Sequence, residues 1–391
     1  MRKTVLIVGE YGSINGGENS LLSILPQLIE FGWQFQAAVP ENSPLADRFK
    51  SLGFRIHDLS ITDQVGVRMT QAEIRARLSD IITRVQPALV HCNSLSTSRI
   101  CGPVTHELKT PSLGYLRDIL KLSKKAIQDI NQMDRLIAVS TATKNWHVEQ
   151  GLESEKTTVI YNGIDAERFA PPKELDELSR ETETSVRVRL GIGSDSPVLL
   201  FVGQIGIRKG VDVLLDSFLN LCESCKTQNK LPPHLIIVGQ RHSLKQEAID
   251  YEKQLQLTAN QSEFSDQIHW VGRRNDVPDL MRTATVLVHP ARQEPLGRVL
   301  LEAAASGLPI ATTSVGGSPE ILADENISQL MVPPNDPAAL SNLLHRLVCE
   351  RGAHQNRRQI ASRLRQIALS KFSNSLCAET VHSHYVKLVG D

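Results

Sequence analysis

The sequence of 391 residues lacks an excess of charge of either sign, because 43 Lys and Arg residues balance 43 Asp and Glu residues. A general nucleic-acid-binding protein normally carries a basic excess, so the sequence disfavours a nucleic-acid partner. Aromatic residues make up only 4% of the chain, which also argues against a surface on which bases stack. No apolar run approaches the roughly 18 residues of a membrane-spanning helix.

Cysteine is also sparse, since six scattered residues do not make a disulfide framework in a chain of this length. Cys222 and Cys225 have a C-x-x-C spacing, but no second ligand pair lies nearby. We interpret them as buried helix cysteines, with a metal or redox role as the alternative. The apolar run after the basic N-terminus is too short for a signal peptide. We therefore expect a cytoplasmic protein.

What the chain does contain is an alternation of short apolar runs and helical patterns. We expect strands at 4–8, 34–39, 88–91, 112–115, 135–139 and 158–160, and a second series at 198–202, 234–238, 267–271, 285–288 and 309–312. Continuous apolar strands separated by helices indicate parallel sheets that are covered on both faces. The break between the series contains two prolines and the polar run 173–185. The sequence therefore predicts an α/β protein of two doubly wound domains facing a cleft.

The most informative stretch is HPARQEPLGRVLLE, residues 289–302. We expect a strand to end at Val288 and a helix to begin near Pro295, because proline suits the first helical position. The first backbone N–H groups of that helix, together with its dipole, would make a phosphate site. These amides belong to Leu296, Gly297 and Arg298.

Two glutamates frame this stretch. At the usual helical rise, Glu294 and Glu302 would lie about 12 Å apart along the axis. That distance matches a diphosphate with a sugar at one end and a ribose at the other, and carboxylates accept hydrogen bonds from paired hydroxyls. The alternative is that both glutamates are solvated or ion-paired.

Three further loops follow predicted strands. In the loop of residues 203–210, the adjacent cations Arg208 and Lys209 could stabilise a diphosphate leaving group. The glycine pair at 316–317 permits a close approach of the backbone to a ligand. The loop of residues 12–18 lacks both the dinucleotide glycine pattern and a Walker lysine, which disfavours hydride transfer and ATP hydrolysis. Each of these loops alone could be an ordinary turn.

Taken together, these motifs resemble the retaining glycosyltransferases of family 4, which have the GT-B fold of two Rossmann-like domains. The resemblance rests on Glu294 and Glu302 at their spacing, EAAASGLP from residue 302 and GGSPE from residue 316. VIYNGID from residue 159 resembles the interdomain marker of that family. The resemblance covers almost the whole chain and is strongest over residues 198–337.

The resemblance implies a domain division and a site. Residues 1–170 would form the acceptor-side domain, residues 186–371 the nucleotide-sugar domain, and the C-terminal helix, 372–391, would pack back on the first domain. The residues implied as catalytic are Lys209, Arg208, Glu294, Asp118 and Arg117. The residues implied as donor-binding are Glu302, Leu296, Gly297, Arg298, Gly16, Gly17, Gly203, Gln204 and Arg273.

The sequence departs from the family pattern at two of these places. Gln204 stands where many members have an arginine, so one phosphate-binding cation is missing. The usual cleft histidine is absent, and Arg117 and Asp118 could replace it. His91, on the preceding strand, is an alternative polar group, although a histidine at a strand end is more often structural.

The implied function is transfer of a sugar from a nucleotide-sugar, with UDP- or GDP-sugars favoured, to an acceptor hydroxyl with retention of configuration. No cofactor or metal is expected, because fixed cations and amides would stabilise the leaving group. The acceptor stays open; a saccharide or lipid-linked molecule of cell-envelope or polysaccharide biosynthesis would fit. A basic amphipathic helix expected over 117–130 could contact the inner face of a membrane, or could simply be solvated. The alternatives are a degenerate GT-B binding or regulatory protein and another GT-B enzyme, such as a sugar-nucleotide epimerase.

Overall fold

The computed structural model describes residues 3–62, 67–171 and 186–390, so the whole polar run 173–185 lies outside the described residues. The chain divides into two compact units. The first contains residues 1–163 and 372–391, and the second contains residues 164–371. The division therefore falls at Gly163, and residues 164–170 belong with the second unit.

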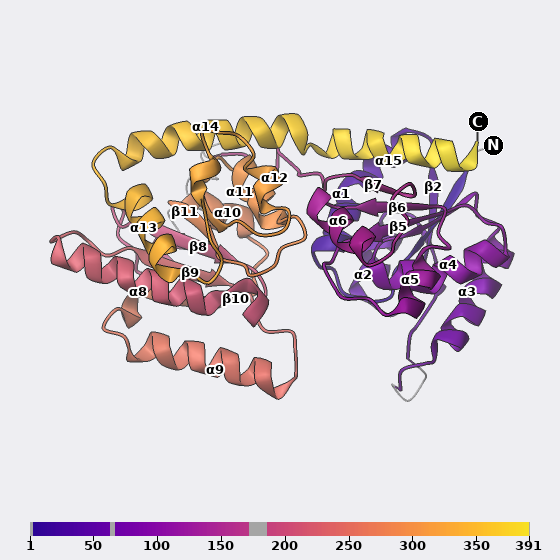
Figure 1. The fold of residues 1–391 in the computed structure, drawn as a ribbon, viewed down its shortest axis with the longest axis horizontal. Coiled ribbons are helices and arrows are strands. Elements are labelled where there is room, and N and C mark those ends of the chain that lie inside the picture. Colours follow the sequence, from indigo (N-terminus) through magenta and orange to yellow (C-terminus); the bar gives the residue numbers. More distant parts are fainter. Residues whose placement is uncertain (1–2, 63–66, 172–185, 391) are drawn as a thin grey trace. The chain divides into compact units, whose positions relative to one another are not determined.

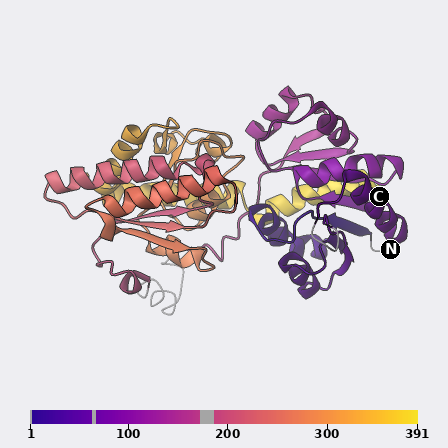
Figure 2. The same cartoon turned by 90° about the horizontal axis from the view of Figure 1, so that it is seen from below.

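The first unit holds a parallel sheet of seven strands in the order β3-β2-β1-β4-β5-β6-β7. Helices lie on both sides of the strands (Figures 1 and 2). Its elements are β1 (Thr4–Val8), α1 (Gly16–Glu30), β2 (Gln34–Val39), α2 (Pro44–Ser51), β3 (Arg55–Asp58), α3 (Gln71–Val85), β4 (Leu89–Cys92), α4 (Leu95–Glu107), β5 (Ser112–Leu116), α5 (Lys124–Ile130), β6 (Arg135–Ala138), α6 (Thr141–Glu149), β7 (Thr157–Val159) and α15 (Asn374–Val389).

The second unit repeats this architecture with six parallel strands in the order β10-β9-β8-β11-β12-β13. Its elements are β8 (Val198–Val202), η2 (Ile207–Lys209), α8 (Val211–Thr227), β9 (His234–Val238), α9 (Gln246–Gln261), η3 (Ser265–Gln267), β10 (Ile268–Gly272), α10 (Val277–Thr283), β11 (Val286–His289), α11 (Arg298–Ala305), β12 (Ile310–Thr313), α12 (Ser318–Ile321), η4 (Ser328–Leu330), β13 (Met331–Val332), α13 (Pro337–Val348) and α14 (Ala353–Lys371).

The strand order determines where a ligand can bind. In both units the chain runs outward through three strands and then returns to the other side of the first. This reversal lies between β1 and β4 in the first unit and between β8 and β11 in the second. In open α/β sheets, ligands bind beyond the carboxyl ends of the strands at such a switch point.

The C-terminal helix α15 is built into the first unit, although it follows the second unit in sequence. It packs along α1, as Figure 1 shows. The indole of Trp33 donates to Nδ1 of His382 at 2.9 Å, and Gln27 donates to Ser375 at 3.0 Å. Gly163 has no room for a side chain, because a Cβ there would lie 2.7 Å from the Cα of Asn374.

The predicted strands are all present, within one residue at each end. The sequence analysis missed β3 and β13. The segment R-I-H-D of β3 is polar enough to be taken for a loop, and β13 has only two residues. The prediction of a basic amphipathic helix over 117–130 is wrong, because within this range only Lys124–Ile130 is helical. Leu116, just before it, belongs to β5. The described residues contain no helix long and apolar enough to cross a membrane.

Candidate active site

A buried charge cluster lies at the switch point of the second unit. Lys209 follows β8 and donates from Nζ to Oε2 of Glu294, which follows β11. The same carboxylate oxygen accepts a hydrogen bond from Nε2 of His289 at 2.7 Å. Glu294 is only 7% exposed and His289 is fully buried. Residues from the two central loops thus meet where the strand order reverses.

The cluster has a defined ionisation. Burial raises the pKa of Glu294, but Lys209 and the hydrogen bond from His289 outweigh burial and hold this pKa well below its usual range. Burial and the charge of Lys209 lower the pKa of His289, despite the neighbouring carboxylate. Because an ionised carboxylate can only accept, neutral His289 carries its proton on Nε2. The site therefore pairs one largely buried cation with one buried anion.

Arg292 and a close backbone approach at Gly210 hold the two loops together. Arg292 donates to both carboxylate oxygens of Asp212, at 2.9 and 2.6 Å, and to the carbonyl of Ile207 at 2.6 Å. The amide of Arg292 donates to the carbonyl of Arg208 at 2.8 Å. A Cβ on Gly210, whose φ is +66°, would lie 2.0 Å from the carbonyl oxygen of Pro290. This contact requires glycine. Sequence analysis missed Arg292 and Asp212 because their pairing spans 80 residues.

The glycine pair of the 316–317 loop has a role different from the one expected. A Cβ on Gly316, whose φ is +53°, would lie 1.8 Å from the carbonyl oxygen of Glu294. The amide of Gly317 donates to the same oxygen at 3.0 Å. The close approach is thus to the chain itself. The pair positions the backbone of Glu294.

The helix after Glu294 begins later than the sequence predicts. α11 starts at Arg298, and Gly297 is its N-cap with a φ of +101°. Of the three amides expected in the first turn, only that of Arg298 is in the helix, and Leu296 lies before the cap. The helical rise therefore cannot be used to space Glu294 from Glu302. Glu302 accepts a hydrogen bond from Nε of Arg298 at 2.8 Å, so two predicted donor-site residues form an ion pair one turn apart.

Other predicted residues lie at the same edge of this sheet. Gly203 and Gln204 follow β8, and Arg273 follows β10 and is exposed. Arg208 is also exposed and donates to the carbonyl of Gln293 at 3.4 Å. All of them share the carboxyl edge with Lys209, as their places in the chain predict.

The first unit has a different group at its own switch point. Arg117, after β5, donates to the backbone oxygen and to Oδ1 of Asn93, both at 2.9 Å, and to Oδ1 of Asn162 at 2.7 Å. Its guanidinium lies 4.1 Å from the centre of the Tyr115 ring. A Cβ on Gly17 would lie 3.0 Å from Cδ of Arg117. The structure thus brings Gly17 and Arg117 together. Sequence analysis missed Asn93, which follows β4.

The remaining residues predicted in the first unit lie apart from the centre of this group. Gly16 is the first residue of α1, and the Asn15 amide before it donates to Glu18 at 2.9 Å. Asp118 is exposed, and its carbonyl accepts a hydrogen bond from His147 at 2.8 Å. His91 is fully buried and bonds through Nδ1 to the hydroxyl of Tyr385 in α15. His91 therefore holds the C-terminal helix.

Comparison with known families assigns the two units separately. Residues 14–168 match "Glycosyltransferase Family 4", and residues 182–365 match "Glycosyl transferases group 1". The second match contains Lys209, Glu294 and Glu302. The chain belongs to the GT-B glycosyltransferases.

Individual relatives agree with this assignment. The chain is 30% identical to a D-inositol 3-phosphate glycosyltransferase of Xylanimonas cellulosilytica, over 52% of this chain and 45% of that protein. It is 34% identical to the lipopolysaccharide glucosyltransferase WaaG of Escherichia coli, over 51% of this chain and 48% of WaaG. These alignments thus span about half the length of each curated relative.

A solved structure resembles this chain over nearly its full length. The Anabaena protein Alr3699/HepE, in complex with UDP and glucose, superposes with a TM-score of 0.83. The superposition covers 99% of this chain and 100% of that one at 19% identity. At this identity the likeness supports the fold alone. Together with the two parallel sheets, it identifies the GT-B fold.

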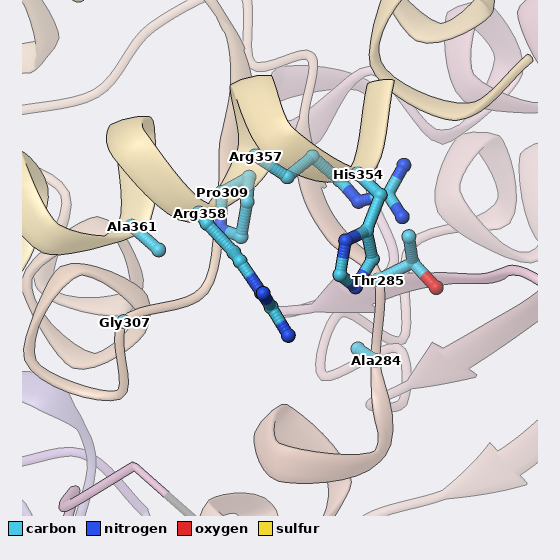
Figure 3. Close-up of a pocket in the computed structure, with 8 residues that line it drawn as sticks. All are labelled: Ala284, Thr285, Gly307, Pro309, His354, Arg357, Arg358 and Ala361. Carbon is cyan, nitrogen blue, oxygen red and sulfur yellow. The ribbon is translucent and has the colours of Figure 1, made fainter. Parts of the chain in front are cut away.

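A separate pocket lies at the opposite edge of the sheet of the second unit. Its lining includes Thr285 and Pro309, which precede β11 and β12. Figure 3 shows His354, Arg357 and Arg358 of α14 beside it. Because the charge cluster lies at the carboxyl ends of these strands, this basic pocket is not the candidate active site.

Proposed function

We propose that the protein transfers a sugar from a nucleoside-diphosphate sugar to an acceptor hydroxyl, with retention of configuration. The observation that carries the proposal is the largely buried pair of Lys209 and Glu294, with side chains 14% and 9% exposed, at the switch point of the second sheet. A fixed cation there can stabilise the diphosphate as it leaves. Retention rests on the resemblance to family 4. The UDP and glucose in the Anabaena protein favour UDP-glucose as the first donor to test.

Each site residue has a role in this proposal. Lys209, aided by the exposed Arg208, binds the diphosphate, and the amides at the start of α11 add partial positive charge. Glu294 orients Lys209 and contacts the donor sugar. Glu302 accepts hydrogen bonds from the ribose hydroxyls, for which Arg298 must share or release the carboxylate. We propose that no metal takes part, so EDTA should leave the rate unchanged.

The acceptor belongs to the first unit in this proposal. The guanidinium of Arg117 is held by two asparagines and a tyrosine ring, so it is a fixed point of positive charge. Exposed Lys121 and Lys124 lie near the start of α5. We include peripheral contact with the cytoplasmic face of a membrane, where a lipid-linked acceptor would be found. Sedimentation with anionic vesicles tests this contact, and loss of cosedimentation in the K121E/K124E variant would support it.

The first test is a thermal-shift screen against UDP-, GDP-, ADP- and dTDP-sugars. A donor that binds only the folded state raises the apparent stability by mass action. One nucleotide series should stabilise the wild type and the Glu263→Ala control, but stabilise Glu302→Ala much less. Glu263 is an exposed glutamate of the same unit whose partner is Lys226. Equal thermal shifts in all three proteins would show that Glu302 does not bind the ribose of the donor.

Turnover separates the proposal from its alternatives. A glycosyltransferase releases its nucleoside diphosphate in step with glycosylated acceptor, and NMR of the product shows the anomeric configuration. Binding of a donor without turnover, across a panel of saccharide and lipid acceptors, would favour the degenerate binding protein. Conversion of the donor into a second sugar without an acceptor would favour an epimerase.

A further inference from the structure

Two cysteines from distant parts of the second unit meet in space. Cys225 lies in the last turn of α8, and Cys349 follows the last residue of α13. These helices pack against each other, and the two sulfur atoms lie 3.2 Å apart across a separation of 124 residues. A disulfide needs about 2 Å between sulfur atoms. A shift of about 1 Å would therefore join them.

The two thiols have different environments. Cys225 is fully buried, whereas Cys349 is partly exposed. The hydrogen bond from Cys225 lowers the pKa of Cys349 to about 7, against burial and with help from Lys230 and Arg357. The hydrogen bond and burial raise the pKa of Cys225. At neutral pH a large fraction of Cys349 is thus the thiolate, which is the nucleophilic form, and Cys225 is the thiol beside it.

The cations beside Cys349 are fixed by the backbone around it. The ammonium of Lys230 donates to the carbonyl of Cys349 at 2.9 Å. The guanidinium of Arg357, which also lines the pocket of Figure 3, donates to the carbonyl of Leu347 at 2.5 Å. These hydrogen bonds place both cations beside Cys349, where their charge lowers the pKa of its thiol.

We propose that Cys349 and Cys225 form a site of reversible oxidation by hydroperoxides. The Cys349 thiolate attacks the terminal peroxide oxygen, which breaks the O–O bond, releases hydroxide or an alkoxide, and leaves a sulfenic acid on Cys349. The Cys225 sulfur then attacks the Cys349 sulfur, and water leaves with the Cys225 proton. The disulfide that forms bridges α8 and α13. Two electrons pass from the thiols to the peroxide, and a dithiol such as dithiothreitol returns them.

The first unit contains an internal control. Cys92 and Cys101 also interact, but both are fully buried. Burial and Cys101 raise the pKa of Cys92 well above its usual value. These two thiols therefore have proximity without exposure, and Cys92 is held in its thiol form. Cys222 is a second control, because it is fully buried one turn before Cys225.

The experiment exposes the reduced full-length protein to hydrogen peroxide, quenches it, alkylates the remaining thiols under denaturing conditions and maps the peptides. We expect a linked Cys225–Cys349 peptide that dithiothreitol removes. Its formation should be at least about tenfold faster than oxidation of Cys92 or Cys101, and should accelerate as the pH rises through 7. The bridge closes a long loop, so the oxidised protein should melt about 5 °C higher.

Three variants assign the roles. Cys225→Ser should accumulate a sulfenic acid on Cys349 that dimedone captures. Cys349→Ser should give neither the adduct nor the linked peptide, and Cys222→Ser should behave as the wild type. The wild-type peptide map does not depend on how well any variant folds. Reduced Cys225 and Cys349 after the buried control thiols have oxidised, or a linkage through Cys222 in their place, would overturn the proposal.

Discussion

His91 and His289 occupy equivalent strands of the two sheets, β4 and β11, yet they bond to different groups. Both are fully buried, and burial lowers the pKa of each. His91 bonds to the phenol of Tyr385, whereas His289 bonds to a carboxylate that Lys209 also holds. The first unit therefore uses this position to attach its C-terminal helix. The second uses it to orient a charged group at the switch point, so a shared scaffold supports two roles.

The variant with the largest expected effect tests whether the positive charge at the switch point of the second unit stabilises the leaving diphosphate. Replacing Lys209 with alanine removes the buried cation and leaves Glu294 without its ion-pair partner. We expect kcat to fall by about 10²–10³-fold, the usual effect of removing one group that stabilises developing charge. The measurement is the initial rate of nucleoside diphosphate release with donor and acceptor saturating.

Lys226→Ala is the matched control for this variant. Lys226 belongs to the same unit and also pairs with a glutamate, but both partners are more than half exposed. Its removal should change kcat by less than about twofold, because exposed ion pairs contribute little. Comparable losses in the two variants would remove Lys209 from its assigned role.

A second prediction concerns pH and the first unit. The pKa of His91 is lowered to about 3 by burial and by Arg117, whereas an unfolded histidine titrates near 6.5. Below pH 6.5 the histidine therefore binds a proton in the unfolded chain but not in the folded chain. The free energy of unfolding falls as the pH drops towards 3. This histidine alone should remove about 2 kcal/mol from the free energy of unfolding between pH 7 and pH 5.

The His91→Asn variant isolates this contribution, since asparagine does not titrate. Urea unfolding should show the variant less stable than the wild type at pH 7, because a cavity and a weakened bond to Tyr385 remain. The difference should shrink by about 2 kcal/mol at pH 5. A difference that stays constant with pH would mean that His91 titrates alike in the folded and unfolded protein.

The third prediction probes the shape of the Arg117 group. Lysine keeps the charge but cannot reach Asn93 and Asn162 together, because it lacks the guanidinium fork. Arg117→Lys should therefore lower the free energy of unfolding by about 1–2 kcal/mol. Arg135→Lys is the control, since Arg135 makes one exposed bond, to the carbonyl of Glu155. Equal urea midpoints for the two variants would show that charge alone suffices at residue 117.

Sequence analysis found the sheets because buried parallel strands are continuous apolar runs, as in Thr4–Val8 and Val198–Val202. It singled out Lys209, Glu294 and Glu302 because they lie in short local motifs, and the structure brings Lys209 and Glu294 together. It could not find Asn93, Arg292 or Asp212, whose partners lie 24 to 80 residues away. It placed the start of α11 three residues early because proline suits a first helical turn, whereas here the left-handed Gly297 delays the helix.

The Cys225–Cys349 contact shows the same limit. The local C-x-x-C spacing drew attention to Cys222 and Cys225, but the sulfur that contacts Cys225 comes from the end of another helix. Only the packing of α8 against α13 brings the two together. Long-range pairs depend on the fold as a whole, so they are the part of a site that cannot be predicted from a single sequence.

The smallest expected effect concerns one of these concealed pairs. Asp212 holds Arg292 from the start of α8, and Tyr251 donates to the same carboxylate at 2.7 Å. Burial raises the pKa of Asp212, but Arg292 and Tyr251 outweigh burial and lower it. Asp212→Asn keeps the shape but removes the charge, and the pair is partly exposed, so we expect a loss of stability of about 1 kcal/mol or less.

Activity reveals whether that pair positions Lys209. Arg292 connects to the Lys209 loop through the carbonyls of Ile207 and Arg208. A less firmly held Arg292 should therefore let the ammonium group of Lys209 shift from its position. We expect Asp212→Asn to lower kcat by about threefold to tenfold while KM for the donor changes little, because a displaced cation weakens transition-state stabilisation most. Asp250→Asn, on the exposed face of α9, serves as the control. A variant with unchanged kcat would show that Gly210 against Pro290 is enough to hold the loops, and that Arg292 contributes to stability alone.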